Sequence, residues 1–226
     1  PPRHELEPEE DAAQDRAVAV WRDLFQPFAP LVDDADVLEI GCGDGRLAAR
    51  LITHGAARSA VGLAPGGDFG PYDSLEGRLT LSSDLTILDT LDDGVVDLVL
   101  ARDLDATLPL DGLERRLSRI YDLLRPGGEA VLRLRCFTPG GQIGAGAGYG
   151  VMTPSAWTII LMRAGFEIVG GAQVWRDQHV QSRVDELLPE TSPEERGCAE
   201  LRLHLVRPWE SWELAGLTAR RSKRRR

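Results

Sequence analysis

Residues 36–50 read Asp-Val-Leu-Glu-Ile-Gly-Cys-Gly-Asp-Gly-Arg-Leu-Ala-Ala-Arg and are the most informative part of the chain. They predict a short apolar strand over 37–40, a turn with glycines at 41, 43 and 45, and a helix that begins at once. Because glycine has no Cβ, such a turn lets backbone N–H groups and a helix N-terminus approach a ligand closely. The stretch therefore predicts a ligand-binding turn, with a purely structural glycine turn as the alternative.

Strand and helix patterns alternate along the rest of the chain. Strands are expected over 37–40, 60–63, 79–81, 95–101, 130–137, 166–175 and 200–206. Helices are expected over 9–28, over 46–54 with Gly55 as a left-handed cap, from a capping box formed by Asp111 and Glu114, and from Thr153 and Pro154. The order predicts an α/β fold: a Rossmann-like, doubly wound, mostly parallel seven-stranded sheet with an antiparallel C-terminal edge. Ligands of such sheets bind at the carboxyl ends of the strands, where the glycine turn lies.

The chain has 226 residues, which fits one α/β domain. We expect a disordered N-terminus over 1–8, a single domain over 9–210, and a C-terminal segment over 211–226 that ends in a disordered basic tail. The net charge of the whole chain is −10. Six basic residues lie between 220 and 226, so the remainder of the chain contains 20 basic and 36 acidic residues. An acidic body repels phosphate backbones, which disfavours a nucleic-acid substrate. The tail remains a candidate site for an anionic partner.

Three cysteines at 42, 136 and 198 are far apart, as expected of reduced thiols in a cytoplasmic protein. No apolar run is long enough to span a bilayer. Clusters of His, Cys and carboxylate residues at metal-ligand spacing are absent, so no metal site is expected. The oligomeric state is not determined by any of these features.

The G-x-G-x-G spacing after Glu39 differs from the G-x-G-x-x-G of dinucleotide-binding turns. It resembles the first motif of class I S-adenosylmethionine-dependent methyltransferases. Further segments resemble the family's later motifs in the same order, over roughly residues 15 to 175: they are 81–88, 92–101, 123–132, 153–157 and 161–169. The 123–132 segment, with its Leu-Arg-Pro-Gly-Gly run, is especially similar to the family's turn into the fifth strand.

The resemblance implies S-adenosylmethionine as cofactor and S-adenosylhomocysteine as product. It also implies a role for Glu39 and the turn amides at the methionine moiety, and for Asp84 at the adenine amino group. The implied cofactor-binding residues are Glu39, Gly41, Cys42, Gly43, Gly45, Leu63, Asp84, Leu85 and Ala101. One position departs from the pattern, because Leu63 stands where the family has an acid that binds the ribose hydroxyls. Asp68 and Asp73, in the following loop, are candidate substitutes.

Methyl transfer from a sulfonium depends mainly on alignment, and a general base is needed only if the acceptor holds a proton. Weak candidates for that base are Asp103, Asp105, Tyr149 and His179. The sequence predicts a methyltransferase that acts on a small molecule or, less readily, on a protein side chain. A non-catalytic methyltransferase-like scaffold or regulatory subunit is the main alternative, motivated by Leu63 and the basic tail. A nicotinamide-dependent oxidoreductase fits less well, because the glycine spacing differs and Lys223 is the only lysine.

Overall fold

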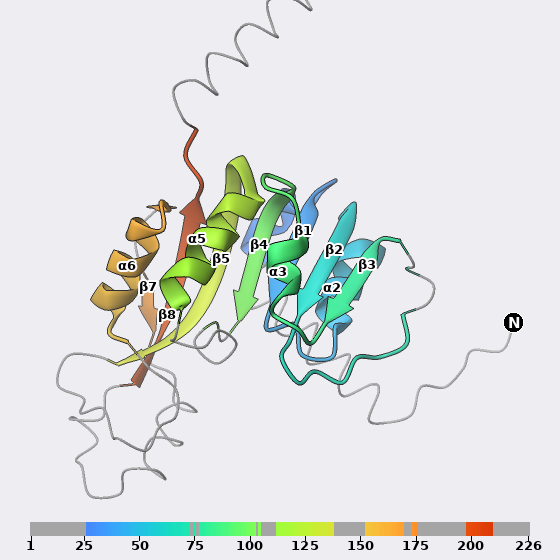
Figure 1. The fold of residues 1–226 in the computed structure, drawn as a ribbon, viewed down its shortest axis with the longest axis horizontal. Helices are drawn as coiled ribbons and strands as arrows, with labels where there is room; N and C mark the ends of the chain where they lie inside the picture. Colours follow the sequence, from blue (N-terminus) through green and yellow to red (C-terminus); the bar gives the residue numbers. More distant parts are fainter. Residues whose placement is uncertain are drawn as a thin grey trace, which may run out of the picture. The chain divides into compact units, whose positions relative to one another are not determined.

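The computed structural model describes residues 26–72, 75, 77–102, 104, 112–137, 152–169, 173–175 and 198–209 (Figure 1). The chain divides into two compact units, Pro1–Leu85 and Thr86–Arg226. The predicted candidates Asp73, Asp103, Asp105, Tyr149 and His179 lie outside the described residues, as do both chain termini. Their predicted roles stay predictions.

The first unit contains three parallel strands in the order β3-β2-β1. The 3-10 helix η2 (Gln26–Leu31) leads into β1 (Asp36–Ile40), and α2 (Arg46–Thr53) connects β1 to β2 (Ser59–Leu63). A loop then leads to β3 (Leu79–Ser82). The three strands predicted from the sequence are confirmed to within one residue at each end.

The end of α2 differs from the predicted left-handed glycine cap. The C-cap is His54, and the residue with positive φ is Ala56, at 60°, rather than Gly55. Gly55 is instead required by packing, because a Cβ there would lie 2.8 Å from the carbonyl oxygen of Leu51. The prediction for Gly55 was therefore wrong about its backbone conformation, although a larger residue would still be unfavourable there.

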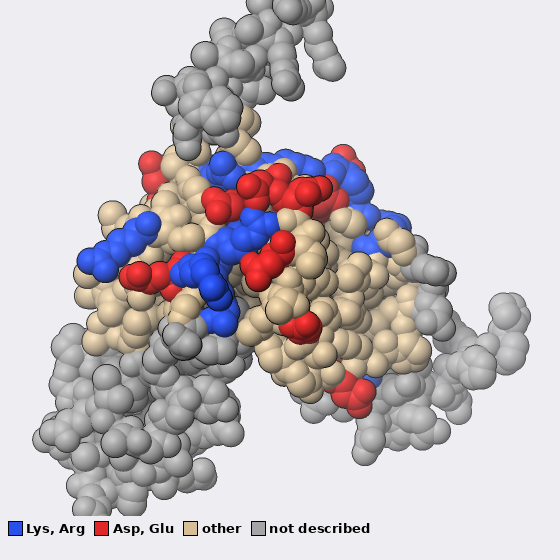
Figure 2. Space-filling view, viewed as in Figure 1, with Lys and Arg blue, Asp and Glu red and all other residues tan. Residues whose placement is uncertain are grey.

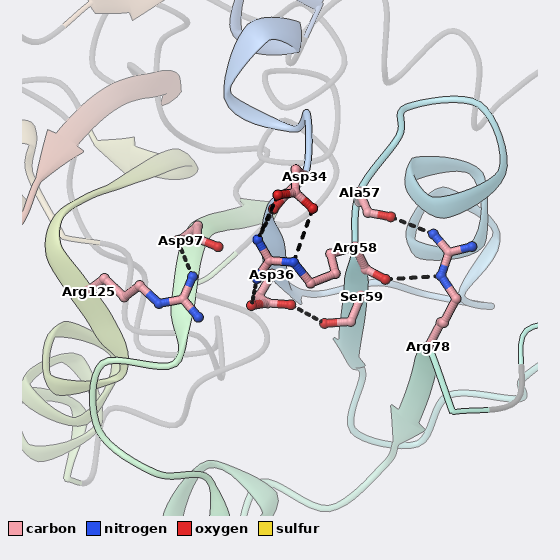
Figure 3. A network of polar contacts seen from close by, with 8 residues as sticks. All are labelled: Asp34, Asp36, Ala57, Arg58, Ser59, Arg78, Asp97 and Arg125. Carbon is pink, nitrogen blue, oxygen red and sulfur yellow. Dashed lines mark hydrogen bonds and ion pairs between the residues drawn. The ribbon is translucent and has the colours of Figure 1, made fainter. Parts of the chain in front are cut away.

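Polar contacts join the amino ends of these strands (Figure 3). The Arg58 guanidinium forms ion pairs with Asp34 at 3.1 Å and with Asp36 at 2.5 Å, and the Ser59 hydroxyl donates to Asp36 at 2.7 Å. Arg78 donates to the carbonyl of Arg58 at 3.0 Å. The hydrogen bond from Arg58 lowers the pKa of Asp34. This network occupies the end of the strands opposite the glycine turn, so we assign it a structural role.

The second unit contains β4 (Val96–Arg102), β5 (Leu124–Phe137), β6 (Glu167–Ile168), β7 (Gln173–Trp175) and β8 (Cys198–Val206). Strands β4 and β5 are parallel, and β8 is antiparallel to β5. Both β6 and β7 pair antiparallel with β8, so the single strand predicted over 166–175 is interrupted. The predicted fold class is confirmed: a mostly parallel α/β sheet with an antiparallel C-terminal edge.

Three helices of the second unit are α3 (Ile87–Thr90), α5 (Leu113–Leu123) and α6 (Pro154–Arg163). The start of α6 is as predicted, since the Thr153 hydroxyl accepts a hydrogen bond from the Ala156 N–H at 3.2 Å. The predicted capping box of α5 is wrong: the N-cap is Gly112, with φ 71° and no side-chain cap hydrogen bond. Helix α3 was not expected from the sequence, because its four residues are too few for a periodic pattern.

The Pro-Gly-Gly turn over 126–128 forms a bulge in β5, where the register with β4 shifts between Val96 and Leu98. The Gly127 N–H donates to the Arg207 carbonyl at 2.8 Å, and a Cβ on Gly127 would lie 2.4 Å from Trp209 Nε1. Arg125, before the bulge, forms an ion pair with Asp97 (Figure 3). These motif residues therefore hold strands together.

On the face seen in Figure 2, basic and acidic side chains of the described residues are interspersed, and they form no continuous basic surface there. Among the described residues, no helix is both long and apolar enough to cross a membrane. The same part of the chain contains no group of three or more His, Cys, Asp or Glu residues that could hold a metal ion.

Candidate functional site

The glycine turn follows the carboxyl end of β1. Its three glycines all have left-handed backbone conformations, with φ of 79° at Gly41, 61° at Gly43 and 83° at Gly45. A side chain is strained at such angles, which explains the three glycines. Gly45, the N-cap of α2, is also packed tightly, because a Cβ there would lie 2.6 Å from Leu81 Cδ1. Gly43 is exposed and is the part of the turn that a ligand can reach.

Several backbone groups of the turn are used within the protein. The Gly45 N–H donates to the Cys42 carbonyl at 3.1 Å, and the Arg46 N–H donates to Asp44 Oδ1 at 3.1 Å. Asp44 also accepts a 2.8 Å hydrogen bond from Arg46 Nε, so its carboxylate is fixed at the start of α2. For the Gly43 N–H, the described residues provide no hydrogen-bond partner. This amide is therefore the best-placed donor for an anionic group of a ligand.

Glu39 is the one charged side chain that is fully buried among the described residues, with 0% exposure. Its register partner on β2 is Gly62, so both residues point to the same face of the sheet. A Cβ on Gly62 would lie 2.6 Å from Leu81 Cδ2 and 3.0 Å from Cys42 Sγ. The glycine at 62 therefore leaves room on this face for Cys42 and Leu81. A buried carboxylate is costly, so a residue of this kind marks a candidate binding position.

Leu63 contributes its backbone rather than its side chain to the turn. Its carbonyl accepts hydrogen bonds from the N–H groups of Gly41 and Cys42, at 2.7 and 3.2 Å. Its side chain is 0% exposed and, as the register partner of Ile40, points to the face opposite Glu39. The next residue, Ala64, continues the ladder through its N–H to the Ser82 carbonyl and is 7% exposed. Alternation along the strand places the Ala64 side chain on the face of Glu39.

The loop after β2 folds back over the glycine turn. The Tyr72 hydroxyl donates to the Asp44 carbonyl at 3.1 Å, and the Gly70 N–H approaches the same oxygen at 3.3 Å. The Tyr72 ring also lies close to Gly45, whose Cβ would be 3.3 Å from Cε2. Burial raises the pKa of Tyr72 to about 12, and the charges of Asp44, Cys42 and Glu39 add to the shift. Tyr72 is therefore a neutral hydrogen-bond donor at physiological pH.

Tyr72 is the main residue of this site that sequence reasoning missed. The available signal was a pair of aromatic residues, Phe69 and Tyr72, within a loop rich in glycine. A Cβ on Gly67 would lie 2.8 Å from the Phe69 ring and 3.0 Å from the Gly43 carbonyl oxygen. The loop therefore comes close to the turn at Gly67, and the Tyr72 ring packs against the turn at Gly45. The candidate acid Asp68 in this loop is exposed.

Asp84 and Leu85 follow the carboxyl end of β3. The Asp84 N–H donates to the Ser82 hydroxyl at 3.0 Å, and this hydroxyl donates to the Asp84 carbonyl at 3.2 Å. These hydrogen bonds fix the backbone of Asp84. Asp84 is exposed, and Leu85 is half-buried. Eight of the nine predicted cofactor-binding residues thus lie in the first unit. The ninth, Ala101, is fully buried near the end of β4 in the second unit.

Comparison with known proteins identifies the fold. No protein-family model and no curated protein matches the chain. Many solved structures do. The [4+2]-cyclase SpnF has a TM-score of 0.63 and 16% identity, with 88% of this chain and 82% of that chain covered. A Burkholderia thailandensis 1,6-didemethyltoxoflavin-N1-methyltransferase, with bound S-adenosylhomocysteine, has a TM-score of 0.55 and 19% identity over 92% and 93% of the two chains.

An S-adenosylmethionine-dependent methyltransferase from Mesorhizobium loti has a TM-score of 0.57 and 19% identity, with 84% of this chain and 98% of that chain covered. At these identities the likeness concerns the fold. The chain has the fold of class I S-adenosylmethionine-dependent methyltransferases, as the sequence motifs predicted.

Proposed function

We propose that the chain is an S-adenosylmethionine-dependent methyltransferase whose acceptor is a small molecule. The observation that carries this proposal is the buried Glu39 beside an exposed, left-handed Gly43, at the carboxyl end of β1 in a fold shared with such enzymes. A fold alone does not determine a reaction, as the similarity to a cyclase illustrates. The proposal therefore depends on the chemistry of the site.

The residues of the turn fit the methionine end of the cofactor. The exposed Gly43 amide, next to the N-terminus of α2, suits a carboxylate because N–H groups and the helix dipole both favour an anion. The buried Glu39 carboxylate favours a cationic group near it. Tyr72 stays neutral, and its hydroxyl donates to the Asp44 carbonyl of the turn.

The adenosine end is expected at the ends of β2 and β3. Asp84 has a fixed backbone and an exposed position, so its carboxylate is suited to accept a hydrogen bond from an exocyclic amino group. The ribose has no acid at Leu63, whose side chain is buried on the other face. Its hydroxyls would rely on backbone groups, water or the exposed Asp68.

When bound, S-adenosylmethionine supplies a methyl group on a sulfonium to a nucleophilic atom of the acceptor. The chain contributes binding, alignment and exclusion of water, which are the main requirements for this transfer. Whether a base assists depends on the acceptor, and Asp103, Asp105, Tyr149 and His179 remain predicted candidates for that role.

Calorimetric titration of the full chain with S-adenosylmethionine and S-adenosylhomocysteine tests the proposal. We expect a dissociation constant in the micromolar range for both ligands. Asp84→Ala should weaken binding by about 1.5–3 kcal/mol, the value of a hydrogen bond to a charged group. Asp92→Ala, which removes another exposed carboxylate, is the matched control and should leave the affinity unchanged.

The second candidate is a non-catalytic scaffold with the methyltransferase fold. The buried Leu63 favours it, because the chain lacks an acid at the position where the family binds ribose. If calorimetry detects no binding at millimolar concentrations of S-adenosylmethionine, the scaffold function is favoured and the methyltransferase function is excluded.

A further inference from the structure

The glycine turn contains peptide groups whose directions depend on one another. The described residues include no cis peptide bond, so the C=O and the N–H of each peptide group point in opposite directions. The Cys42 carbonyl and the Gly43 N–H belong to one such group. The Asp44 carbonyl and the Gly45 N–H belong to another. A hydrogen bond that holds one end of a group therefore determines where its other end points.

Tyr72 holds the second of these peptide groups. Its hydroxyl donates to the Asp44 carbonyl at 3.1 Å, and the Gly70 N–H donates to the same oxygen at the longer distance of 3.3 Å. The other end of the group, the Gly45 N–H, donates to the Cys42 carbonyl at 3.1 Å. Tyr72 therefore fixes the peptide group that in turn holds the Cys42 carbonyl.

The direction of the Gly43 N–H follows from the Cys42 carbonyl. Because this carbonyl accepts its hydrogen bond from within the turn, the Gly43 N–H points the opposite way. The two preceding N–H groups, of Gly41 and Cys42, both donate to the Leu63 carbonyl, at 2.7 and 3.2 Å. Gly43 is exposed, so its N–H is the donor of the turn that a ligand can reach.

The Tyr72 ring packs where two glycines leave room for it. The residue is half-buried. A Cβ on Gly70 would lie 3.1 Å from the Tyr72 hydroxyl oxygen, and a Cβ on Gly45 would lie 3.3 Å from Cε2 of the ring. Burial raises the pKa of Tyr72 to about 12, so the hydroxyl keeps the proton that it donates. The contact between the loop and the turn is therefore specific to this side chain.

We propose that Tyr72 is a positioning residue of the cofactor site, whose hydroxyl aims the Gly43 N–H at the carboxylate of S-adenosylmethionine. Tyr72 acts through the Asp44 carbonyl and need not touch the ligand. A donor that already points the right way does not have to be ordered on binding, and this preorganisation increases affinity. The inference rests on the proposed function and adds to it a residue from outside the glycine turn.

The Tyr72→Phe variant tests the proposal, because it removes the hydroxyl and keeps the ring. Calorimetry compares S-adenosylmethionine with decarboxylated S-adenosylmethionine, which lacks only the carboxylate. We expect the variant to bind S-adenosylmethionine about three- to tenfold more weakly, as for the loss of one hydrogen bond. Its affinity for the decarboxylated ligand should equal that of the natural chain. Its melting temperature should fall by no more than about 6 °C.

Tyr121→Phe is the matched control, because it also deletes a tyrosine hydroxyl. Tyr121 lies on α5, where its ring packs edge-on against Phe166 at a centroid distance of 5.3 Å. This variant should bind both ligands as the natural chain does. Gly70→Ala is a second test, since its Cβ would press on the Tyr72 hydroxyl and displace it. It should show the same selective loss of affinity for the ligand with the carboxylate.

Hydrogen exchange of the backbone amides, measured by NMR without ligand, tests the positioning itself. The Gly45 N–H should exchange faster in Tyr72→Phe than in the natural chain, because its peptide group has lost the hydroxyl that holds it. If affinity for S-adenosylmethionine falls while exchange at Gly45 stays the same, the Tyr72 hydroxyl binds the ligand directly and the positioning role is refuted.

Two further results would overturn the proposal. A folded Tyr72→Phe variant could bind S-adenosylmethionine as tightly as the natural chain, or it could lose affinity equally for both ligands, as a general loss of structure would cause. In both cases the natural chain still binds S-adenosylmethionine, so the proposed function stands. If the natural chain binds neither ligand, the proposed function fails and the role of Tyr72 fails with it.

Discussion

Replacing Leu63 by Asp should strongly destabilise the chain, although the sequence motif of the methyltransferase family has an acid at this position. The Leu63 side chain is 0% exposed and lies on the face of Ile40. Removing a buried leucine costs about 2–5 kcal/mol. An unpartnered carboxylate in the same place adds a further penalty of roughly 1–3 kcal/mol or more. We therefore expect a loss of at least about 3 kcal/mol.

That loss is large relative to the total stability of about 5–15 kcal/mol for a native protein. It corresponds to a fall in melting temperature of about 6 °C or more, at roughly 2–4 °C per kcal/mol for a chain of this size. Thermal unfolding followed by circular dichroism measures it. The penalty should shrink as the pH is lowered towards about 5, because burial raises the pKa of a carboxyl group and the neutral form is then favoured.

Ala64→Asp is the matched control, since it introduces the same carboxylate one residue later, on the face of Glu39. Ala64 is 7% exposed and loses only a methyl group, so a smaller fall in melting temperature is expected. If the ribose lies at this face, the variant should also bind S-adenosylmethionine more tightly, by up to about 1.5–3 kcal/mol. The reasoning fails if Leu63→Asp melts like the natural chain while Ala64→Asp unfolds.

Three further predictions concern the turn, its covering tyrosine and the motif at the start of β4. Gly43→Val should abolish binding of S-adenosylmethionine in calorimetry, whereas Gly94→Val, at a similar φ of 65° with no atom near its Cβ, should cost similar stability and leave binding intact. Tyr72, with its pKa raised to about 12, keeps its proton in the folded chain while unfolded tyrosine loses it near 10, so stability should fall as the pH rises from 10 to 12. In the Tyr72→Phe variant, absorbance titration should show no tyrosine that ionises near pH 12, and alkaline unfolding should show a smaller fall in stability between pH 10 and 12. Asp97→Asn removes the ion pair with Arg125 and should cost at most about 1 kcal/mol, with no change in cofactor affinity by calorimetry.

The sequence predicted the strands and the α6 start because their signals are local. Short apolar runs mark the strands of the first unit. At the start of α6 the Thr153 hydroxyl accepts from the Ala156 N–H, and Pro154 has no N–H to satisfy. Gly55 and Asp111 were misjudged for the opposite reason. A glycine near a helix end can be required by a left-handed angle or by close packing, and only the structure shows that Leu51 excludes a side chain at 55.

The site was predicted in part. The glycine turn and Glu39 are contiguous, so one stretch of sequence reveals them. Tyr72 comes from a loop 28 residues beyond Asp44, and its contact with the Asp44 carbonyl depends on how that loop returns. The face of Leu63 also depends on the register of β2 against β1, which a one-residue slip would reverse. The sequence motif therefore identified the end of β2 correctly, but it did not reveal which side chain lies on the same face of the sheet as Glu39.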